Sequence, residues 1–300
     1  MRYPERVVIT EVGPRDGLQN EAAPIPLESK IELVNRLSDT GLSRIEAASF
    51  VSPKAIPQMA NASEVMAGIQ RRPGVTYIAL VPNERGAHDA LAARADEISV
   101  VVSASESHNR SNVNRSVAES LEGVRGIASL CREAGVPWAG YVATSFGCPY
   151  EGLVAEESVL RVAHEYADAG AYAVALGDTI GVGNPAQVSE LVGALTGAVK
   201  PVPVRLHFHD TYGRALANTI AAMEVGAGQF DGSIGGLGGC PYAPGASGNV
   251  ATEDMVSMLE KMGIDTGVDM SVLLDVAEFV QDVVKRRLDG KVLRATLASR

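Results

Sequence analysis

The sequence predicts a (β/α)8 TIM barrel with one additional helix near its C-terminal end. Two observations support this fold. Short apolar runs alternate with helical stretches along the 300-residue chain, and eight such runs are present. The repeating part occupies about 260 residues, close to the ~250 residues that are typical of this barrel. A doubly wound open sheet has the same alternation of strands and helices and is the alternative fold.

Each predicted strand is a short run rich in Val, Ile and other residues that favour β-structure. Most of the runs are apolar on both faces, as in a parallel sheet covered by helices. The predicted strands are Val7–Val12, Arg44–Phe50, Thr76–Val81, Glu97–Ser103, Trp138–Thr144, Tyr172–Gly177, Val204–His209 and Gln229–Ile234.

The stretches between these strands are amphipathic or rich in alanine, as expected of helices that pack on a barrel. The predicted helices are Glu28–Ser38, Val117–Ala134, Glu156–Ala169, Pro185–Ala198, Ala215–Val225 and Thr252–Met262. A further helix is expected from about Val268 to Leu288, followed by a frayed tail. Because no low-complexity linker interrupts the chain, we expect residues 1–300 to form a single domain.

The acidic composition bears on the partners of the protein. The 36 acidic and 26 basic residues give a net charge of −10 and a pI near 5.1. This charge argues against nucleic acid and anionic membranes as partners. The three cysteines are too few for a disulfide framework, and no apolar run approaches the ~18 residues of a membrane span. With no signal or transit pattern at its start, we expect a cytoplasmic enzyme.

In a barrel of this kind, catalytic residues lie at the C-terminal ends of the strands and in the loops that follow. Unusual polar residues of this sequence gather at those positions. They are, in chain order, Glu11, Arg15, Asp16, Gln19, Glu46, Asp178 and Thr179. A Pro-Gly turn with a surface ion pair explains part of Gly13–Glu21. It does not explain a cation beside a carboxylate at the mouth of a buried strand.

His207 and His209 end the seventh predicted strand. Because side chains alternate between the faces of a strand, both imidazoles point to one side, which is the lumen in a barrel. There they either share a cation or are satisfied by hydrogen bonds. Strands 1, 7 and 8 are neighbours in a closed barrel, so Asp16 and Asn249 are the nearest oxygen candidates. Oxygen ligands favour Mg²⁺ or Mn²⁺, whereas cysteine ligands favour Zn²⁺.

A glycine-rich loop, Gly235–Asn249, follows the eighth predicted strand and holds Cys240 near its centre. Its six glycines permit close approach of the backbone to a ligand and allow the loop to move as a lid. A plain flexible linker has no need of a central thiol, so Cys240 is a candidate acid or base beside the metal. Cys148, after the fifth strand, is expected to pack in the core.

Six segments, taken together and in this order, resemble the 3-hydroxy-3-methylglutaryl-CoA (HMG-CoA) lyases. They are Arg15–Glu21, Glu46–Pro53, Gly147–Gly152, Gly177–Gly181, His207–Thr211 and Gly235–Asn249. The resemblance extends from about Val7 to Met262, and the wider group includes Claisen-type synthases. It implies a divalent-metal-dependent carbon–carbon lyase. Such an enzyme splits (S)-HMG-CoA into acetyl-CoA and acetoacetate by retro-Claisen chemistry.

The resemblance also implies the metal ligands. Asp16, His207, His209 and Asn249 are the expected ligands of Mg²⁺ or Mn²⁺. A cation bound to the substrate hydroxyl lowers the pKa of that hydroxyl. Asp16, or a water beside it, is the expected acceptor of the hydroxyl proton.

The remaining catalytic roles concern the enolate that forms when the carbon–carbon bond breaks. Arg15 is expected to stabilise the enolate oxygen, an effect of about 10²–10³ in rate for one donor. Glu46 is expected to support the site through Arg15, and Cys240 to deliver a proton to the enolate. The expected contacts to the substrate come from Arg15, Gln19, Asp178 and Thr179.

One segment departs from the lyase pattern and leaves the acyl group open. His108, Arg110 and Arg115 stand where the lyases carry less charged residues, on a predicted loop after the fourth strand. This is either neutral drift on a surface turn or a change in the acyl group or phosphate contacts. The alternative substrates are a related 3-hydroxy-3-alkylglutaryl-CoA and citramalyl-CoA. The alternative functions are a Claisen-type condensation and a catalytically idle metal-binding barrel.

Two further expectations concern partners. The substrate is an acyl-CoA, and its phosphates need local cations in so acidic a protein. The candidates are Lys54, Arg85, Arg110 and Arg115, which the sequence does not rank. We also expect a homodimer, with the helix near Val272–Leu288 as an apolar face for its formation.

Overall fold

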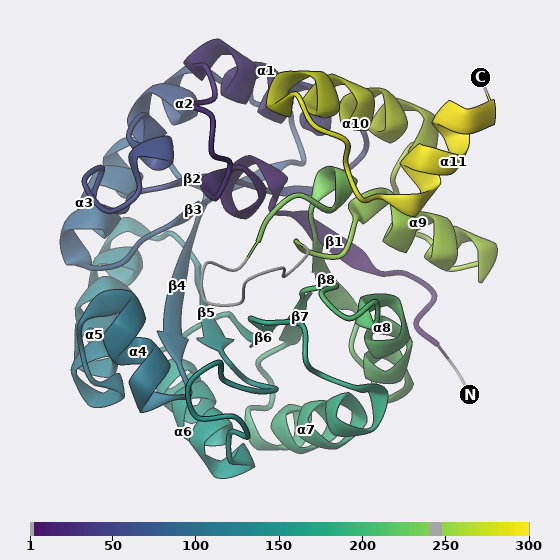
Figure 1. The fold of residues 1–300 in the computed structure, drawn as a ribbon. Helices are drawn as coiled ribbons and strands as arrows, with labels where there is room; N and C mark the ends of the chain where they lie inside the picture. Colours follow the sequence, from purple (N-terminus) through teal and green to yellow (C-terminus); the bar gives the residue numbers. More distant parts are fainter. Residues whose placement is uncertain (1–2, 240–247, 300) are drawn as a thin grey trace.

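Eight parallel strands close into a barrel in chain order, and the helices surround it (Figure 1). The structure is a computed structural model that describes residues 3–239 and 248–299. The first and last strands pair in parallel, with Val8 opposite Gln229 and Glu11 opposite Gly232. This closure confirms the predicted TIM barrel and excludes the open sheet.

The strands and helices have the following bounds. The strands are β1 (Val8–Glu11), β2 (Arg44–Ser49), β3 (Thr76–Leu80), β4 (Glu97–Ser103), β5 (Trp138–Ala143), β6 (Ala173–Asp178), β7 (Val204–Phe208) and β8 (Gln229–Gly232). The helices are α1 (Leu27–Ser38), α2 (Ala62–Gly68), α3 (Glu84–Ala92), α4 (Glu106–Val113), α5 (Val117–Ala134), α6 (Glu156–Asp168), α7 (Pro185–Ala198), α8 (Ala215–Glu224), α9 (Thr252–Lys261), α10 (Met270–Val284) and α11 (Lys291–Ser299).

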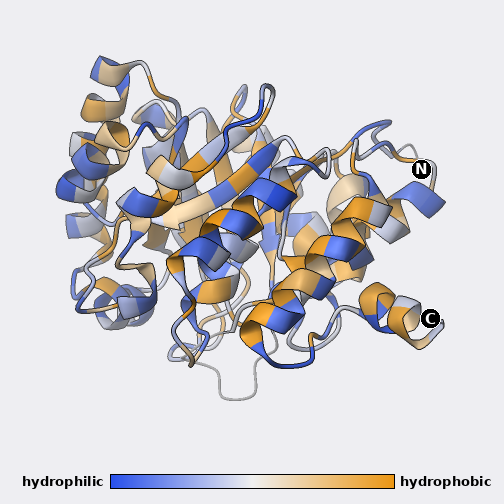
Figure 2. Ribbon diagram, turned by 90° about the horizontal axis from the view of Figure 1, so that it is seen from above, coloured by the Kyte–Doolittle hydropathy of each residue, from blue (hydrophilic) through white to orange (hydrophobic). Residues whose placement is uncertain are grey.

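The core lies between the barrel and the helices, as the alternation of the sequence predicts. In Figure 2, hydrophobic and hydrophilic residues alternate along the outer helices, as expected of helices with one face on the barrel. The strand residues that face outward, such as Ile98, Val100 and Val102 of β4, are buried beneath them. In the described part of the chain, no helix is both long and apolar enough to cross a bilayer.

The predicted loop that carries His108 is a helix, α4, which corrects the sequence analysis. The Oγ of Ser105 caps it by accepting a hydrogen bond of 3.1 Å from the amide of His108. Asn114 ends it in the left-handed conformation, at φ 54°. The pattern was missed because α4 is short and polar, so its sequence lacks the apolar period that marks a helix.

The segment after α10 is also ordered, where the sequence led us to expect a frayed tail. Asp254 on α9 accepts hydrogen bonds from the amides of Lys291 and Val292, at 2.9 and 2.7 Å. These bonds satisfy the first amides of α11, as a capping residue would. The cap comes from a residue distant in sequence, so local reasoning did not find it.

Glu253 is a fully buried carboxyl group at the start of α9. Its Oε2 accepts a hydrogen bond of 2.9 Å from the amide of Gly235, at the root of the glycine-rich loop. Burial raises the pKa of Glu253 to about 8, although the bond from Gly235 opposes this change. The folded protein therefore keeps this carboxyl group protonated at neutral pH.

We expect Glu253 to reduce folding stability as the pH rises from 4.5, its ordinary pKa, to about 8. Over this range the unfolded chain releases the proton while the folded chain retains it. The cost is up to about 1.4 kcal/mol per pH unit. Glu253→Gln removes the titration, so its free energy of unfolding relative to wild type should increase with pH. Urea unfolding between about pH 5 and pH 8 measures this difference.

Glu260→Gln, at an exposed position on the same helix, is the matched control and should follow the wild type. A constant difference between Glu253→Gln and wild type across this pH range would contradict the prediction.

Candidate active site and metal centre

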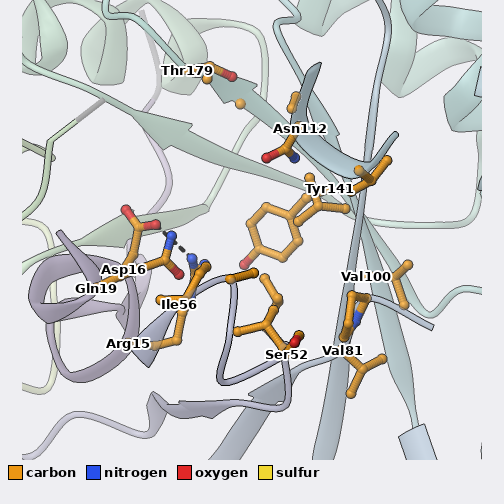
Figure 3. A pocket seen from close by; sticks show the side chains of 18 of the residues that line it. Arg15, Asp16, Gln19, Ser52, Ile56, Val81, Val100, Asn112, Tyr141 and Thr179 are labelled. Carbon is orange, nitrogen blue, oxygen red and sulfur yellow. Dashed lines mark hydrogen bonds and ion pairs between the residues drawn. The ribbon is translucent and has the colours of Figure 1, made fainter. Parts of the chain in front are cut away.

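A cavity of about 970 Å³ opens at the C-terminal end of the barrel (Figure 3). The candidate residues that line it are Arg15, Asp16, Gln19, Thr179, His207 and His209. They lie at the end of β7 or follow strands β1, β6 and β7, which the closed barrel brings to the same rim. The location agrees with the rule that predicted it.

A tight turn after β1 positions Arg15 and Asp16. Residues Gly13–Gly17 form a single π-helical turn, in which the amides of Asp16 and Gly17 donate to the carbonyl of Val12 at 2.7 and 3.2 Å. Such turns are rare in proteins overall, and many of those that occur lie at functional sites. Glycine is required at position 13, because a Cβ there would lie 2.5 Å from Oε1 of Glu11.

Glu11 itself is fully buried and does not line the cavity. Its carboxylate accepts hydrogen bonds from the amides of Gly13 and Ile234 and from the hydroxyl of Thr252, at 2.6, 2.9 and 2.6 Å. It therefore ties the turn after β1 to the segment after β8.

Arg15 is held between two carboxylates. Its Nε donates to Oε2 of Glu46 at 2.5 Å, and its Nη1 donates to Oδ1 of Asp16 at 2.6 Å. Burial alone would lower the pKa of Arg15, but Glu46 and Asp16 raise it above the ordinary value. The guanidinium is thus a permanent, fixed positive charge at the rim of the cavity.

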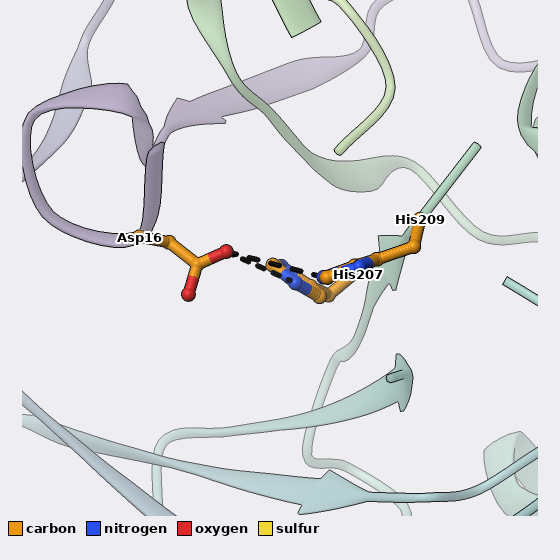
Figure 4. A group of neighbouring side chains, drawn as sticks. All are labelled: Asp16, His207 and His209. Carbon is orange, nitrogen blue, oxygen red and sulfur yellow. Dashed lines mark ion pairs between the residues drawn. The ribbon is translucent and has the colours of Figure 1, made fainter. Parts of the chain in front are cut away.

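Three potential metal ligands converge beside this arginine. The ligand atoms of Asp16, His207 and His209 all lie within 4.8 Å of one another. Figure 4 shows both imidazoles directed at the Asp16 carboxylate, with each Nε2 at 3.9 Å from Oδ2. This separation is too long for a hydrogen bond and suits a cation bound between the groups.

The protonation of two of these groups, Asp16 and His209, also fits a cation. Burial would raise the pKa of Asp16, but Arg15 and the two histidines hold it well below its usual range. Burial and the neighbouring His207 lower the pKa of His209 to about 4. An ionised carboxylate and a neutral imidazole are the forms that bind a metal.

Asn249 lies at the same cluster. Its Nδ2 donates to Oδ2 of Asp16 at 2.7 Å and to the carbonyl of Leu237 at 3.2 Å. Turning the amide group about its last bond would present its oxygen to a cation beside Asp16. The residue is 3% exposed, so the cation would be shielded from solvent on this side.

Asp231 is a buried member of the site that the sequence analysis missed. It lies on β8 directly opposite His207 on β7, and its Oδ2 is 3.1 Å from Nδ1 of that histidine. The carboxylate therefore holds a hydrogen on Nδ1 and leaves Nε2 free to face Asp16. The available signal was an aspartate within an apolar strand next to the histidine strand.

Asp231→Asn is expected to weaken binding of Mg²⁺ by about 10–100-fold, the usual effect of losing a group that orients a histidine ligand. The substitution keeps the shape of the side chain and removes the charge that holds His207. Isothermal titration calorimetry measures the affinity. Asp168→Asn, at an exposed position on α6, is the control. Equal affinities in all three proteins would show that Asp231 does not orient the ligand.

The other predicted residues fall into two groups. Gln19 and Thr179 line the cavity, and Thr179 also accepts a hydrogen bond of 2.8 Å from the amide of Thr144. Asp178 is fully buried and accepts from the amides of Val182 and Gly183, both at 3.0 Å. Its contacts hold the loop after β6, and its expected contact with the substrate stays a prediction.

Of the two cysteines with predicted roles, the structure describes Cys148 but not Cys240. Cys148 is 3% exposed, and its sulfur accepts from the amides of Tyr150 and Glu151 at 3.3 and 3.4 Å. Its predicted packing in the core is confirmed. Cys240 lies outside the described residues.

The cations proposed for the CoA phosphates are distributed unevenly. Arg115 lines the cavity together with His108, whereas Lys54, Arg85 and Arg110 are not among the lining residues. His108 is 2% exposed and its Nδ1 lies 3.1 Å from Oγ of Ser103. Burial lowers its pKa, so His108 presents a neutral ring to the cavity and Arg115 a charge.

Comparison with known proteins places this site in a family. The chain matches the HMGL-like family over residues 6–280. It is 48% identical over 293 residues to the mitochondrial hydroxymethylglutaryl-CoA lyase of Rattus norvegicus, covering 98% of this chain and 90% of the relative.

Solved structures agree with the sequence relatives. The HMG-CoA lyase of Bacillus subtilis has a TM-score of 0.97 at 49% identity, covering 99% of this chain and 100% of that chain. An HMG-CoA lyase from Acinetobacter baumannii, solved with coenzyme A and 3-methylmalate, has a TM-score of 0.94 at 42% identity, covering 98% of this chain and 96% of that chain. With the Arg15–Asp16 pair and the two histidines at one rim, these matches confirm the resemblance, and the chain belongs to the HMG-CoA lyases of the HMGL-like family.

Proposed function

We propose that this protein cleaves (S)-HMG-CoA into acetyl-CoA and acetoacetate, with a divalent cation bound at Asp16, His207 and His209. The observation that carries the proposal is the permanent charge of Arg15 directly beside this cluster, in one cavity. Relatives with the same fold and nearly half of the residues in common are named for this activity.

The proposed chemistry needs one group for the hydroxyl and another for the enolate. Arg15 stabilises the enolate oxygen, and Glu46 holds its guanidinium in place through the 2.5 Å bond. Asp16, or a water beside it, accepts the proton of the tertiary hydroxyl. Gln19 and Thr179 line the cavity and contact the remainder of the acyl group.

Asp16, His207, His209 and Asn249 would hold the cation. The carboxylate and amide oxygens of this set favour Mg²⁺ or Mn²⁺. When bound, the cation supplies positive charge that lowers the pKa of the substrate hydroxyl. Asp231 supports it by fixing the orientation of His207.

Cys240 is proposed to deliver the proton that converts the enolate into acetyl-CoA. The preceding residue supports this role, because the carbonyl of Gly239 accepts a hydrogen bond of 3.0 Å from Nδ2 of Asn20. That bond ties Gly239 to the segment that directly follows the turn with Arg15 and Asp16. A thiol is a suitable general acid for a carbanion in a closed site.

A different acyl-CoA is the alternative substrate, and the ligand of a related structure supports it. The relative from Acinetobacter baumannii was solved with coenzyme A and 3-methylmalate, which has one carbon fewer than the HMG acyl group. In this chain Arg115 and His108 line the cavity. A related 3-hydroxy-3-alkylglutaryl-CoA or citramalyl-CoA would place its acyl group against the same arginine and cation.

The test is release of acetyl-CoA from racemic HMG-CoA with Mg²⁺ or Mn²⁺, with EDTA, and with a Cys240→Ala variant. We expect metal-dependent turnover near about 10 s⁻¹, an ordinary rate for an enzyme. EDTA should abolish it and Cys240→Ala should reduce it strongly. If the folded, metal-bound protein does not act on HMG-CoA but cleaves citramalyl-CoA, the alternative substrate is correct.

Two further proposals concern the assembly and its location. We propose a homodimer, formed through the region of α10, and a cytoplasmic location. The relatives from Rattus norvegicus include one named as cytoplasmic, at 46% identity, and one named as mitochondrial, at 48%. Light scattering of the purified protein and cell fractionation test the two proposals separately.

A further inference from the structure

Arg205 is a buried arginine inside the barrel that the proposed chemistry does not use. It lies on β7, two residues before His207, and has no exposed surface. Its Nη1 donates to the phenol oxygen of Tyr141 at 3.0 Å and lies 3.5 Å from Oε1 of Glu97. Its Nη2 donates to the phenol oxygen of Tyr172 at 2.6 Å. Glu97, which also pairs with Arg44, is the carboxylate beside the buried charge, and two phenols accept hydrogen bonds from the guanidinium.

The phenol of Tyr141, on β5, has one hydrogen left to donate. A guanidinium has no acceptor, so Tyr141 accepts in its bond with Arg205. Within residues 3–239 and 248–299, the structure shows no bond that the Tyr141 hydroxyl donates. Burial raises the pKa of Tyr141 well above its ordinary value, although Arg205 opposes this. The phenol therefore keeps its hydrogen at neutral pH.

The hydroxyl of Tyr141 faces the cavity. The residue is 7% exposed and lines the cavity, and in Figure 3 its oxygen lies at the end of the ring nearer Arg15. The ring meets the ring of His207 edge-on, with 6.2 Å between the centroids. The unused donor is therefore among the groups that we assign to the enolate and to the metal.

We propose that Tyr141 donates a hydrogen bond to the acyl oxygen that becomes negatively charged, beside Arg15, and that Arg205 holds the phenol in this orientation. The inference rests on the proposed function, which identifies that oxygen as the thioester oxygen of an acyl-CoA. The phenol keeps its proton throughout and makes no covalent bond. Tyr141 is then a catalytic residue, and Arg205 is a positioning residue that acts through it.

If the hydroxyl of Tyr141 had only a structural role, its removal would change the binding of the metal. Oδ1 of Asp231 and Oε1 of Glu46 are buried and have no partner among the described residues. If the Tyr141 hydrogen served one of these oxygens, its loss would disturb His207 through Asp231, or Arg15 through Glu46. Binding of the cation would then weaken. Metal affinity therefore separates the two roles.

The first comparison is Tyr141→Phe against Tyr172→Phe, both in the full chain with Mg²⁺. Tyr172 is the matched control, because its phenol bonds to the same arginine but is not among the residues that line the cavity. We expect Tyr141→Phe to lower kcat by about 10²-fold, as for other donors to a developing oxyanion. Its KM and its affinity for Mg²⁺ should stay close to wild type, and Tyr172→Phe should retain most of the activity.

Arg205→Lys tests the positioning role, since it keeps the charge beside Glu97 and removes the planar donor group. It should lower kcat without changing the affinity for Mg²⁺. The double variant with Tyr141→Phe should be no slower than Tyr141→Phe alone, because coupled residues are not additive. Additive losses would show that Arg205 does not act through Tyr141.

Exchange of deuterium from D₂O into the methyl group of acetyl-CoA measures enolate stabilisation without cleavage. If the wild type exchanges acetyl-CoA but does not cleave HMG-CoA, the proposed substrate is rejected. The exchange rate of Tyr141→Phe then still decides this inference. The inference is overturned if Tyr141→Phe keeps more than half of the wild-type exchange rate, or if its affinity for Mg²⁺ falls along with that rate.

Discussion

Replacing Arg15 with methionine is expected to lower kcat by about 10²–10³-fold or more. The enolate oxygen then loses a fixed positive charge at the rim of the cavity. Glu46 and Asp16 also lose the cation that links them, at 2.5 and 2.6 Å in the present structure. Steady-state kinetics with HMG-CoA measure kcat, and exchange of deuterium into acetyl-CoA measures the enolate step alone.

Two variants make the Arg15 result specific. Arg15→Lys keeps a charge but cannot bond to Glu46 and Asp16 with a planar group, so its kcat should be intermediate. Arg72→Met removes an exposed arginine that pairs with Asp39 and should leave kcat unchanged. If Arg15→Met cleaved HMG-CoA at nearly the wild-type rate, the enolate would have to be stabilised by another group.

Replacing His209 with alanine is expected to weaken binding of Mg²⁺ by more than about 100-fold and to abolish cleavage. Loss of a residue that only orients a ligand costs about 10–100-fold, so loss of a ligand should cost more. His209 is 6% exposed and its Nε2 is directed at Asp16, so a water would not replace it with the same geometry. Calorimetry with Mg²⁺ measures the affinity, and thermal unfolding checks the fold.

His164→Ala is the control for His209, because His164 is exposed on α6 and belongs to no cluster of potential ligands in the described chain. Its affinity for Mg²⁺ should equal that of wild type. Addition of EDTA to wild type should reproduce the activity of His209→Ala. Tight binding of Mg²⁺ to His209→Ala would move the metal centre away from Asp16 and His207.

The barrel was predictable because its signals are local. Each strand is an apolar run of a few residues, and most helices show one apolar face within their own sequence. The exceptions have physical causes. The helix α4 is polar and is stabilised by a cap at Ser105, and α11 is capped by Asp254, a residue of another helix.

The part of the candidate site that was predictable is the part that closure of the barrel brings together. Asp16 follows β1 and the two histidines end β7, so closure through β8 brings them to one place. The same argument predicted Asn249, whose amide reaches Asp16. It did not predict that Asp178 would be buried beneath its loop, because that depends on how the loop backbone folds over the side chain.

Contacts inside the barrel were not predictable in the same way. Asp231 meets His207 because β7 and β8 pair in one particular register. Arg205 meets Tyr141 across the interior, although the two residues are 64 positions apart in sequence. Each contact requires a strand register and a side-chain conformation that cannot be predicted from a local sequence pattern.

The sequence by itself determined the order of strands and helices, the rim where we place the chemistry and the residues that we propose as ligands of a cation there. These follow from local periodicity and from the rule that strand ends meet in a closed barrel. Only the tertiary structure decided which carboxylate orients His207 and that a buried arginine donates a hydrogen bond to the phenol of Tyr141. The reason is that buried polar groups must find partners across the interior, and those partners depend on strand register and side-chain packing rather than on neighbours in sequence.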